Sequence, residues 1–218
     1  MALTAYGEGD ARLFHFVFRE DEILIAGDGK TAGQTAAGAP LGEGQLPDGT
    51  LFSRLAREVR ADGSHPRLFS DREYGYAALM LDAEADAPEG FCFIPLREFF
   101  WLTKSEDEQL QAHSSPLGSL AARAHGFLCL LAIYRFCPRC GSRLAFDGRE
   151  TAMRCTNPSC GRLDFPHIEP AVIVLVRRGT GEQEELLLVK NRNFRRDFYG
   201  CVSGFVEMGE SIENAAVR

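Results

Sequence analysis

The fold is decided by two short stretches that read Cys137-Pro-Arg-Cys140-Gly141 and Cys155-Thr-Asn-Pro-Ser-Cys160-Gly161. Each stretch places two thiols on one tight turn, which proline and glycine favour and in which backbone amides can hydrogen-bond to sulfur. Two such turns can bring four thiolates to one tetrahedral zinc ion. Four sulfur ligands leave no open coordination position, so the spacing predicts a structural Zn²⁺ that stabilises a module too small for its own core.

Disulfide bonding and nucleic-acid binding are the alternatives to a purely structural zinc ribbon. Free or disulfide-bonded cysteines are disfavoured by the paired spacing and by the lack of a secretory signal. Nucleic-acid binding by the ribbon stays open because arginines are frequent there, although acidic residues interrupt them and favour an ordinary solvated surface. These arginines are Arg139, Arg143, Arg149, Arg154 and Arg162, and the acidic residues are Asp147, Glu150 and Asp164. Cys92, Cys129 and Cys201 lie in apolar stretches and are predicted to be small core residues.

Upstream of the cysteines, residues 1–136 are predicted to form a small α+β domain with a connecting helix. Apolar runs on either side of Arg19-Glu-Asp-Glu22 predict a strand hairpin between Arg12 and Ile25. Further strands are expected at 74–81 and 90–95, and residues 27–49 are expected to form a long loop. Helices are expected at 96–102 and 117–136. In the second helix Leu120, Ala124, Leu128 and Ala132 recur at four-residue spacing on one face.

Downstream, residues 137–165 form the predicted ribbon and a further domain is expected over 166–218. Strand-like runs at Pro170–Arg177 and Leu186–Lys190 bracket an exposed connection and predict a strand pair. Another strand should lead into Gly204. Ser211 is suited to cap a helix whose first turn carries Glu213, a favourable position for an acidic group.

Composition and charge limit the partners. The chain has 218 residues, with 45% hydrophobic and 25% charged residues, which is typical of globular proteins. Its net charge of −7 divides into about −8 up to Phe136, about +3 from Cys137 to Gly200 and about −2 thereafter. The middle segment therefore suits an anionic ligand, but its excess is too small for wide contact with a nucleic-acid backbone. We find no secretory signal and no apolar stretch near the roughly 20 residues that span a bilayer, so we expect a cytoplasmic protein without a membrane partner.

The last residues carry a recognisable motif. Gly204-Phe-Val-Glu-Met-Gly-Glu210, followed by Arg218, resembles the first two thirds of a Nudix box, which is Gly, five residues, Glu, seven residues, then Arg-Glu-apolar-x-Glu-Glu. Together with the ribbon, Phe165-Pro-His-Ile-Glu-Pro170 and Phe93-Ile-Pro-Leu-Arg97, this layout is similar to the NADH pyrophosphatase branch of the Nudix hydrolases. The resemblance is specific from about Phe93 onward.

The resemblance implies a fold and an activity. The fold class is then α+β: an N-terminal α+β domain, the zinc ribbon and the start of an α/β/α Nudix domain. The activity is cleavage of NADH or NAD⁺ into AMP and nicotinamide mononucleotide, and in some members removal of NAD caps from RNA. Catalysis in this family uses Mg²⁺ or Mn²⁺, and the protein generally works as a homodimer.

Roles for individual residues follow from the same resemblance. The main-chain carbonyl of Ser203 would contact the catalytic metal, and Glu210 and Arg218 would pair to brace the loop. Phe205 would stack on a substrate base, and Phe165 would face it from the other subunit. Phe205 and Phe165 could instead be core residues.

Other candidate substrate contacts lie outside the motif. Glu150 aligns with a substrate-contacting glutamate, with a solvated ribbon tip as the alternative. Arg192, Arg195 and Arg196 could steer phosphates, although a solvated loop is favoured for them.

Two departures from the family pattern affect the prediction. The second cysteine pair is separated by four residues, where many bacterial members have two. The glutamates expected after Arg218 are not among the 218 residues, so we expect a chain truncated inside its motif and inactive by itself. Alternatives are a zinc-ribbon interaction module, a pseudoenzyme fragment, or a Nudix hydrolase of another nucleoside diphosphate derivative.

Overall fold

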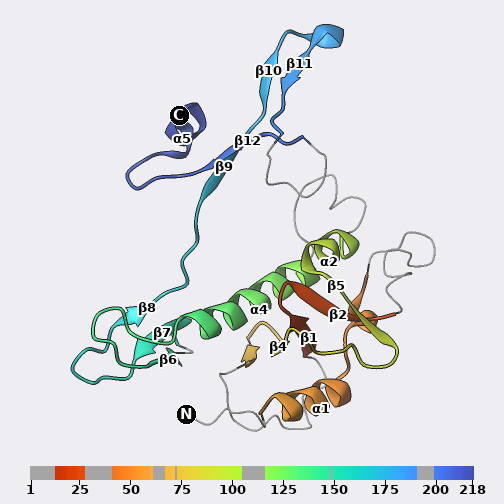
Figure 1. The fold of residues 1–218 in the computed structure, drawn as a ribbon, viewed down its shortest axis with the longest axis vertical. Helices are drawn as coiled ribbons and strands as arrows, with labels where there is room; N and C mark the ends of the chain where they lie inside the picture. The colour runs from red at the N-terminus through yellow and green to blue at the C-terminus, as the bar shows by residue number, and fades with distance from the viewer. Residues whose placement is uncertain are drawn as a thin grey trace. The chain divides into compact units, whose positions relative to one another are not determined.

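A computed structural model describes residues 13–27, 41–60, 67–71, 73–104, 116–147, 149–190 and 199–218. The chain divides into two compact units, Met1–Phe165 and Pro166–Arg218 (Figure 1). The predicted N-terminal domain and ribbon both fall in the first unit. Helices and strands are mixed along the chain, which confirms the α+β class.

The first unit is built on a five-stranded sheet with the order β3-β4-β1-β2-β5. Antiparallel pairing joins β1 to β2, β2 to β5 and β3 to β4, whereas β1 and β4 are parallel. The predicted hairpin and the two further strands are confirmed. The strands are β1 (Phe14–Arg19), β2 (Glu22–Ala26), β3 (Leu68–Asp71), β4 (Tyr76–Leu81) and β5 (Phe91–Pro95).

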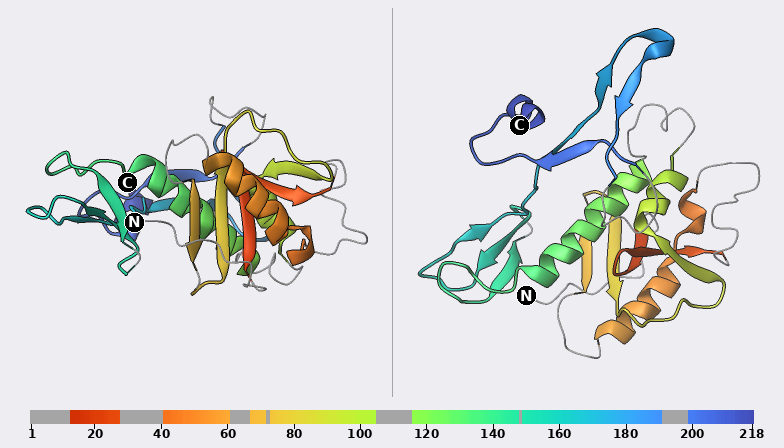
Figure 2. Two further views of the ribbon diagram at one scale, coloured as in Figure 1. Left: turned by 90° about the horizontal axis from the view of Figure 1, so that it is seen from below. Right: turned by 45° about the horizontal axis from the view of Figure 1, so that its top comes forward.

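Helices cover both faces of this sheet (Figure 2). Successive side chains of a strand point to opposite faces, so Phe16 and Phe18 enter one core while Val17 enters the other. The core around Phe16 includes residues of α2 (Leu96–Leu102) and α4 (Pro116–Ile133), and the core around Val17 includes α1 (Gly49–Arg60). Burial on both faces explains why β1 reads as a continuous apolar run.

The buried face of helix α4 differs from the face predicted from the sequence. Ala124 and Leu128 are buried as expected, but Leu120 is half-buried and Ala132 is exposed. A strict four-residue repeat rotates about 40° per step relative to a helix of 3.6 residues per turn, so its last member leaves the buried face. The helix also ends at Ile133, three residues before the predicted end.

Helix α4 also meets the length and composition criteria for a membrane-spanning helix, which was not expected from the sequence. Among the described residues, α4 is long and apolar enough to cross a bilayer by length and composition alone, with a mean hydropathy of 1.4. In this structure it packs on β4, β3 and β1, as a core helix does.

Helix α1 and strand β3 were not predicted. Helix α1 nevertheless carries Phe52, Leu55 and Ala56 on one buried face. Asp48 precedes it, and its carboxylate accepts a 2.7 Å hydrogen bond from the amide of Leu51. The short 3₁₀ helix η2 (Glu43–Gln45) lies within the predicted loop, of which residues 28–40 are outside the described residues.

The cysteine segment forms a three-stranded antiparallel ribbon. Its strands are β6 (Leu144–Asp147), β7 (Ala152–Cys155) and β8 (Leu163–Asp164), in the order β6-β7-β8. Phe146 and Met153 pack against the larger core of the first unit, so the ribbon continues that core.

The strands of the second unit differ from the predicted strand pair. The run Pro170–Arg177 is divided at Leu175 into β9 (Ala171–Val174) and β10 (Val176–Arg178). Strand β9 pairs with β12 (Val202–Phe205), and β10 pairs with β11 (Glu185–Leu187). The break arises because the two halves hydrogen-bond to different partners. The unit also contains η3 (Gly181–Gln183) and α5 (Ile212–Val217).

Candidate metal centre and Nudix loop

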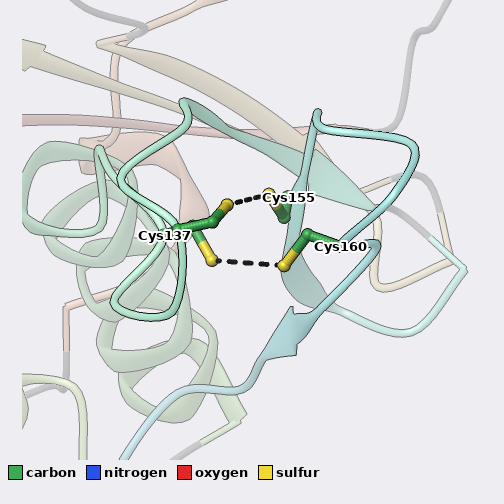
Figure 3. A group of neighbouring side chains, drawn as sticks. Cys137, Cys155 and Cys160 are labelled. Carbon is green, nitrogen blue, oxygen red and sulfur yellow. Dashed lines mark hydrogen bonds between the residues drawn. The ribbon is translucent and has the colours of Figure 1, made fainter.

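The four predicted zinc ligands converge on one point. The Sγ atoms of Cys137, Cys140, Cys155 and Cys160 all lie within 4.8 Å of one another. The distance is 3.8 Å between the sulfurs of Cys137 and Cys160 and 3.4 Å between those of Cys140 and Cys155 (Figure 3). Tetrahedral zinc with Zn–S bonds of about 2.3 Å needs sulfur separations of about 3.8 Å. The cluster therefore fits Zn²⁺, and the prediction of a four-cysteine zinc ribbon is confirmed.

Local backbone structure aims these sulfurs inward. Gly141 and Gly161 follow the two turns with φ of 72° and 53°, the left-handed region in which glycine is favoured. Their amides donate 2.9 Å hydrogen bonds to the carbonyls of Cys137 and Asn157, respectively, which closes each turn. Pairing of β6 with β7 then places Leu144 opposite Cys155 and holds the two turns face to face.

The cysteines differ in acidity as well as in position. Hydrogen bonds from Ser142 lower the pKa of the exposed Cys140 thiol to about 6. Burial raises the pKa of Cys155 to about 12. Zinc binds thiolates, so loading of the site must displace a proton from the buried cysteine.

The loop between β12 and α5, which carries the motif that resembles a Nudix box, is held by one arginine. Arg218 donates from Nε to Oε1 of Glu210 at 2.8 Å and from Nη2 to Oε2 of Glu210 at 3.0 Å. The same Nη2 donates to the carbonyl of Phe205 at 2.9 Å, and Oε2 of Glu210 accepts from the amide of Glu207 at 3.0 Å. These contacts fix the loop from β12 to α5 and lower the pKa of Glu210 to about 2, chiefly through the hydrogen bond from Arg218.

The helix start after this loop forms as the sequence predicts. Ser211 is the N-cap of α5, and its hydroxyl accepts a 3.1 Å hydrogen bond from the amide of Asn214. The pKa of Glu213, in the first turn, is lowered by hydrogen bonds from its own amide and from Ser211.

The remaining predicted residues occupy separate positions. Ser203 is exposed on β12, opposite Ile173 of β9. Phe205 is 65% exposed at the end of β12, and Phe165 is 49% exposed after β8, so neither is a core residue in this structure. Glu150 is exposed in the turn between β6 and β7. Arg192, Arg195 and Arg196 lie outside the described residues.

Two contacts of the site were missed by sequence reasoning. One is the bond from Arg218 to the carbonyl of Phe205, and the other is the 2.9 Å hydrogen bond from the amide of Val206 to the carbonyl of Pro170. Both use main-chain oxygens, which any residue supplies, so side-chain identity carries no signal for them.

Comparison with known families assigns the two parts of the site. Residues 134–163 match the NADH pyrophosphatase zinc ribbon domain, and residues 167–218 match the NUDIX domain.

Several curated relatives are similar to this chain. The NAD-capped RNA hydrolase NudC of Pseudomonas aeruginosa is 34% identical over 140 residues, which cover 64% of this chain and 44% of the relative. The protein of the same name from Chromobacterium violaceum is 40% identical over 98 residues, covering 45% of this chain and 35% of the relative. That from Deinococcus radiodurans is 27% identical over 205 residues, covering 93% of this chain and 59% of the relative. The chain thus spans about half the length of the curated relatives it matches. By these two matches, the chain combines an NADH pyrophosphatase zinc ribbon domain with NUDIX domain sequence.

Proposed function

We propose that this chain serves in the hydrolysis of the diphosphate bond of NADH or NAD⁺ to AMP and nicotinamide mononucleotide, and in the removal of NAD caps from RNA. The observation that carries the proposal is a Nudix loop closed by Glu210 and Arg218 in the same chain as a four-cysteine ribbon of the NADH pyrophosphatase type. The names of the curated relatives support the capped RNA as a substrate.

The catalytic cation is proposed to be Mg²⁺ or Mn²⁺. Both oxygens of Glu210 already accept hydrogen bonds, so we propose that this residue chiefly braces the loop. The oxygen donors near the loop that suit a hard cation are the carbonyl of Ser203 and the exposed carboxylates of Glu207 and Glu213. A bound cation would neutralise charge on the diphosphate and activate water.

Substrate recognition is proposed to use exposed aromatic rings. Phe205 leaves β12 at the point where its own carbonyl is held by Arg218, so its backbone is fixed while its ring is open to a base. Phe165 is proposed to supply the facing ring from the second subunit of a homodimer, and Glu150 to contact substrate. The cytoplasm is the proposed location, since zinc thiolates are stable in a reducing compartment.

The test is a product assay on two polypeptides. We expect the 218-residue chain with Mg²⁺ or Mn²⁺ to release no AMP from NADH above a metal-only control. A chain extended through Arg-Glu-apolar-x-Glu-Glu and the rest of the domain should release AMP and nicotinamide mononucleotide, because the added carboxylates complete the metal ligands.

Two results would contradict this proposal. Metal-dependent cleavage by the 218-residue chain would mean that the catalytic carboxylates are misplaced. An extended chain that cleaves ADP-ribose but neither NADH, NAD⁺ nor NAD-capped RNA would indicate another nucleoside diphosphate substrate.

A further inference from the structure

We infer that the ribbon carries a binding surface for single-stranded RNA, formed by Phe136, Arg135 and Arg143. The inference rests on the proposed function, in which the substrate includes a capped RNA, and it identifies where the RNA beyond the cap is held. This surface is hereafter the Phe136 surface.

An exposed aromatic ring between arginines is its central feature. Phe136 is 53% exposed, although it adjoins the buried zinc ligand Cys137. The guanidinium carbons of Arg143 and Arg135 lie 5.5 and 5.9 Å from the centre of its ring. Bases of single strands stack on such rings regardless of sequence, and arginines beside the ring bind the adjoining phosphates.

The backbone of the surface is rigid. Phe136 and Arg143 face each other in an antiparallel bridge. The amide of Leu144 donates to the carbonyl of Arg135 at 3.0 Å, and the amide of Cys137 donates to the carbonyl of Ser142 at 2.7 Å. The carbonyl of Arg143 accepts from both the amide and the hydroxyl of Thr156. A backbone fixed in this way by the two turns loses little conformational entropy on binding.

Charge separates this surface from the rest of the ribbon. Residues 134–165 contain six arginines and three carboxylates, in a chain of net charge −7. Arg154 pairs with Asp147 at 2.5 Å and Arg162 with Asp164 at 3.5 Å. Within the described residues, the other four arginines form no ion pair with a carboxylate, and all of them are exposed: Arg135, Arg139, Arg143 and Arg149. Two of these four unpaired arginines, Arg135 and Arg143, lie beside the ring of Phe136.

A single strand fits this surface better than a duplex. One exposed ring can stack only on a base whose face is free, and a duplex hides its base faces against neighbouring pairs. Two cations also provide too few phosphate contacts for tight non-specific binding to double-stranded DNA, which typically uses more.

Binding is tested with the zinc-loaded 218-residue chain and a fluorescein-labelled, uncapped single-stranded RNA of about ten nucleotides, within the usual range of single-strand site sizes. Fluorescence anisotropy gives Kd over a series of salt concentrations. The variants are Phe136→Ala, Phe136→Leu, Phe136→Trp and Arg143→Gln. Arg154→Gln is the charge-matched control, because it removes an arginine of the same ribbon that is already paired.

We expect Phe136→Ala to raise Kd by about 5- to 150-fold, which corresponds to about 1–3 kcal/mol for one stacked base. Phe136→Leu should behave similarly, since it keeps an apolar side chain without a ring, and Phe136→Trp should bind as the parent does. Arg143→Gln should reduce the slope of log K against log salt by about 0.7, the value for one phosphate contact on a single strand. Arg154→Gln should leave both Kd and slope unchanged.

Unchanged RNA affinity in Phe136→Leu and Arg143→Gln, with zinc content preserved, would overturn the inference. A loss of RNA affinity in the Phe136 and Arg143 variants that is no larger than the loss in Arg154→Gln would also overturn it. So would a change in the oligomeric state of these variants without a change in their RNA affinity. Tighter binding to duplex DNA of equal length would assign the surface to another ligand. Cleavage of NADH by the extended chain without RNA binding would reject this surface alone, whereas RNA binding without NADH cleavage would reject only the diphosphatase proposal.

Discussion

The two units of the chain bury apolar side chains to very different extents. In the first unit Phe16, Phe18 and Val17 have no exposed surface, since helices close both faces of a five-stranded sheet. In the second unit the apolar strand residues Ile173, Leu186 and Val202 are 76%, 51% and 37% exposed, and each sheet has two strands.

Strands of similar hydrophobicity are thus buried in the first unit and partly exposed in the second. A two-stranded sheet is only marginally stable in water without further packing, whereas five strands between helices exclude water from both faces. The ribbon reaches stability in another way, through one metal site and a junction with the larger core.

Removal of one zinc ligand should have the largest effect. Cys155→Ser should abolish zinc binding and unfold the ribbon, because apparent binding energies of structural zinc are about 10–16 kcal/mol. The sheet of the first unit should remain folded. Zinc content and amide hydrogen exchange measure the two outcomes, with Cys201→Ser as a control outside the cluster. Retention of stoichiometric zinc by Cys155→Ser would contradict the assigned ligand set.

Core substitutions should distinguish the two units directly. Phe18→Ala should lower the free energy of unfolding of the first unit by about 3–5 kcal/mol, because it leaves a cavity at a site without exposed surface. Ile173→Ala, at a side chain that is 76% exposed, should change stability by about 0.5 kcal/mol or less. Denaturant unfolding followed by hydrogen exchange reports each unit. Equal losses from the two substitutions would mean that Ile173 is buried in solution.

Phe205→Ala tests whether exposure in the second unit serves recognition. In an extended, active chain it should raise KM for NADH, with a loss of about 1–3 kcal/mol for one base stack. Its melting temperature should change little, since the ring is 65% exposed. Steady-state kinetics and thermal unfolding are the measurements. A sharp fall in melting temperature with KM unchanged would assign Phe205 to the core.

The smallest effect should be the acid response of the Nudix loop. The pKa of Glu210 falls from 4.5 to about 2 in the folded chain. A lowered pKa means that the pair with Arg218 stabilises the loop above about pH 4.5 and that this contribution is lost as pH falls toward 2.

NMR titration of the Glu210 carboxyl and of the amide of Glu207 measures this response. Glu210→Gln should remove the transition, while Glu207→Gln, which removes the longer 3.7 Å contact to Arg218, should keep it. A Glu210 carboxyl that titrates near its ordinary pKa would show that the pair does not persist in solution.

Local signals account for what could be predicted. The turn chemistry around Gly141 and Gly161 and the cysteine spacing are enough to identify the ligand cluster. The cap at Ser211 and the apolar runs of β1 and β2 likewise depend on neighbouring residues only. Helix α1 had such a signal in Leu51, Leu55 and Val59, which recur at helical spacing, although no helix was assigned there.

By itself, then, the sequence determined the zinc ligands, the hairpin and the start of α5, because short-range sterics and hydrogen bonding specify them. The α+β class of the whole chain followed from the family resemblance. The tertiary structure decided which residues of α4 are buried, where the strand at Leu175 divides, and that Phe136 and Phe205 remain exposed. These features depend on which distant segments pack or pair with each residue. An apolar side chain carries the same local signal whether or not a partner covers it.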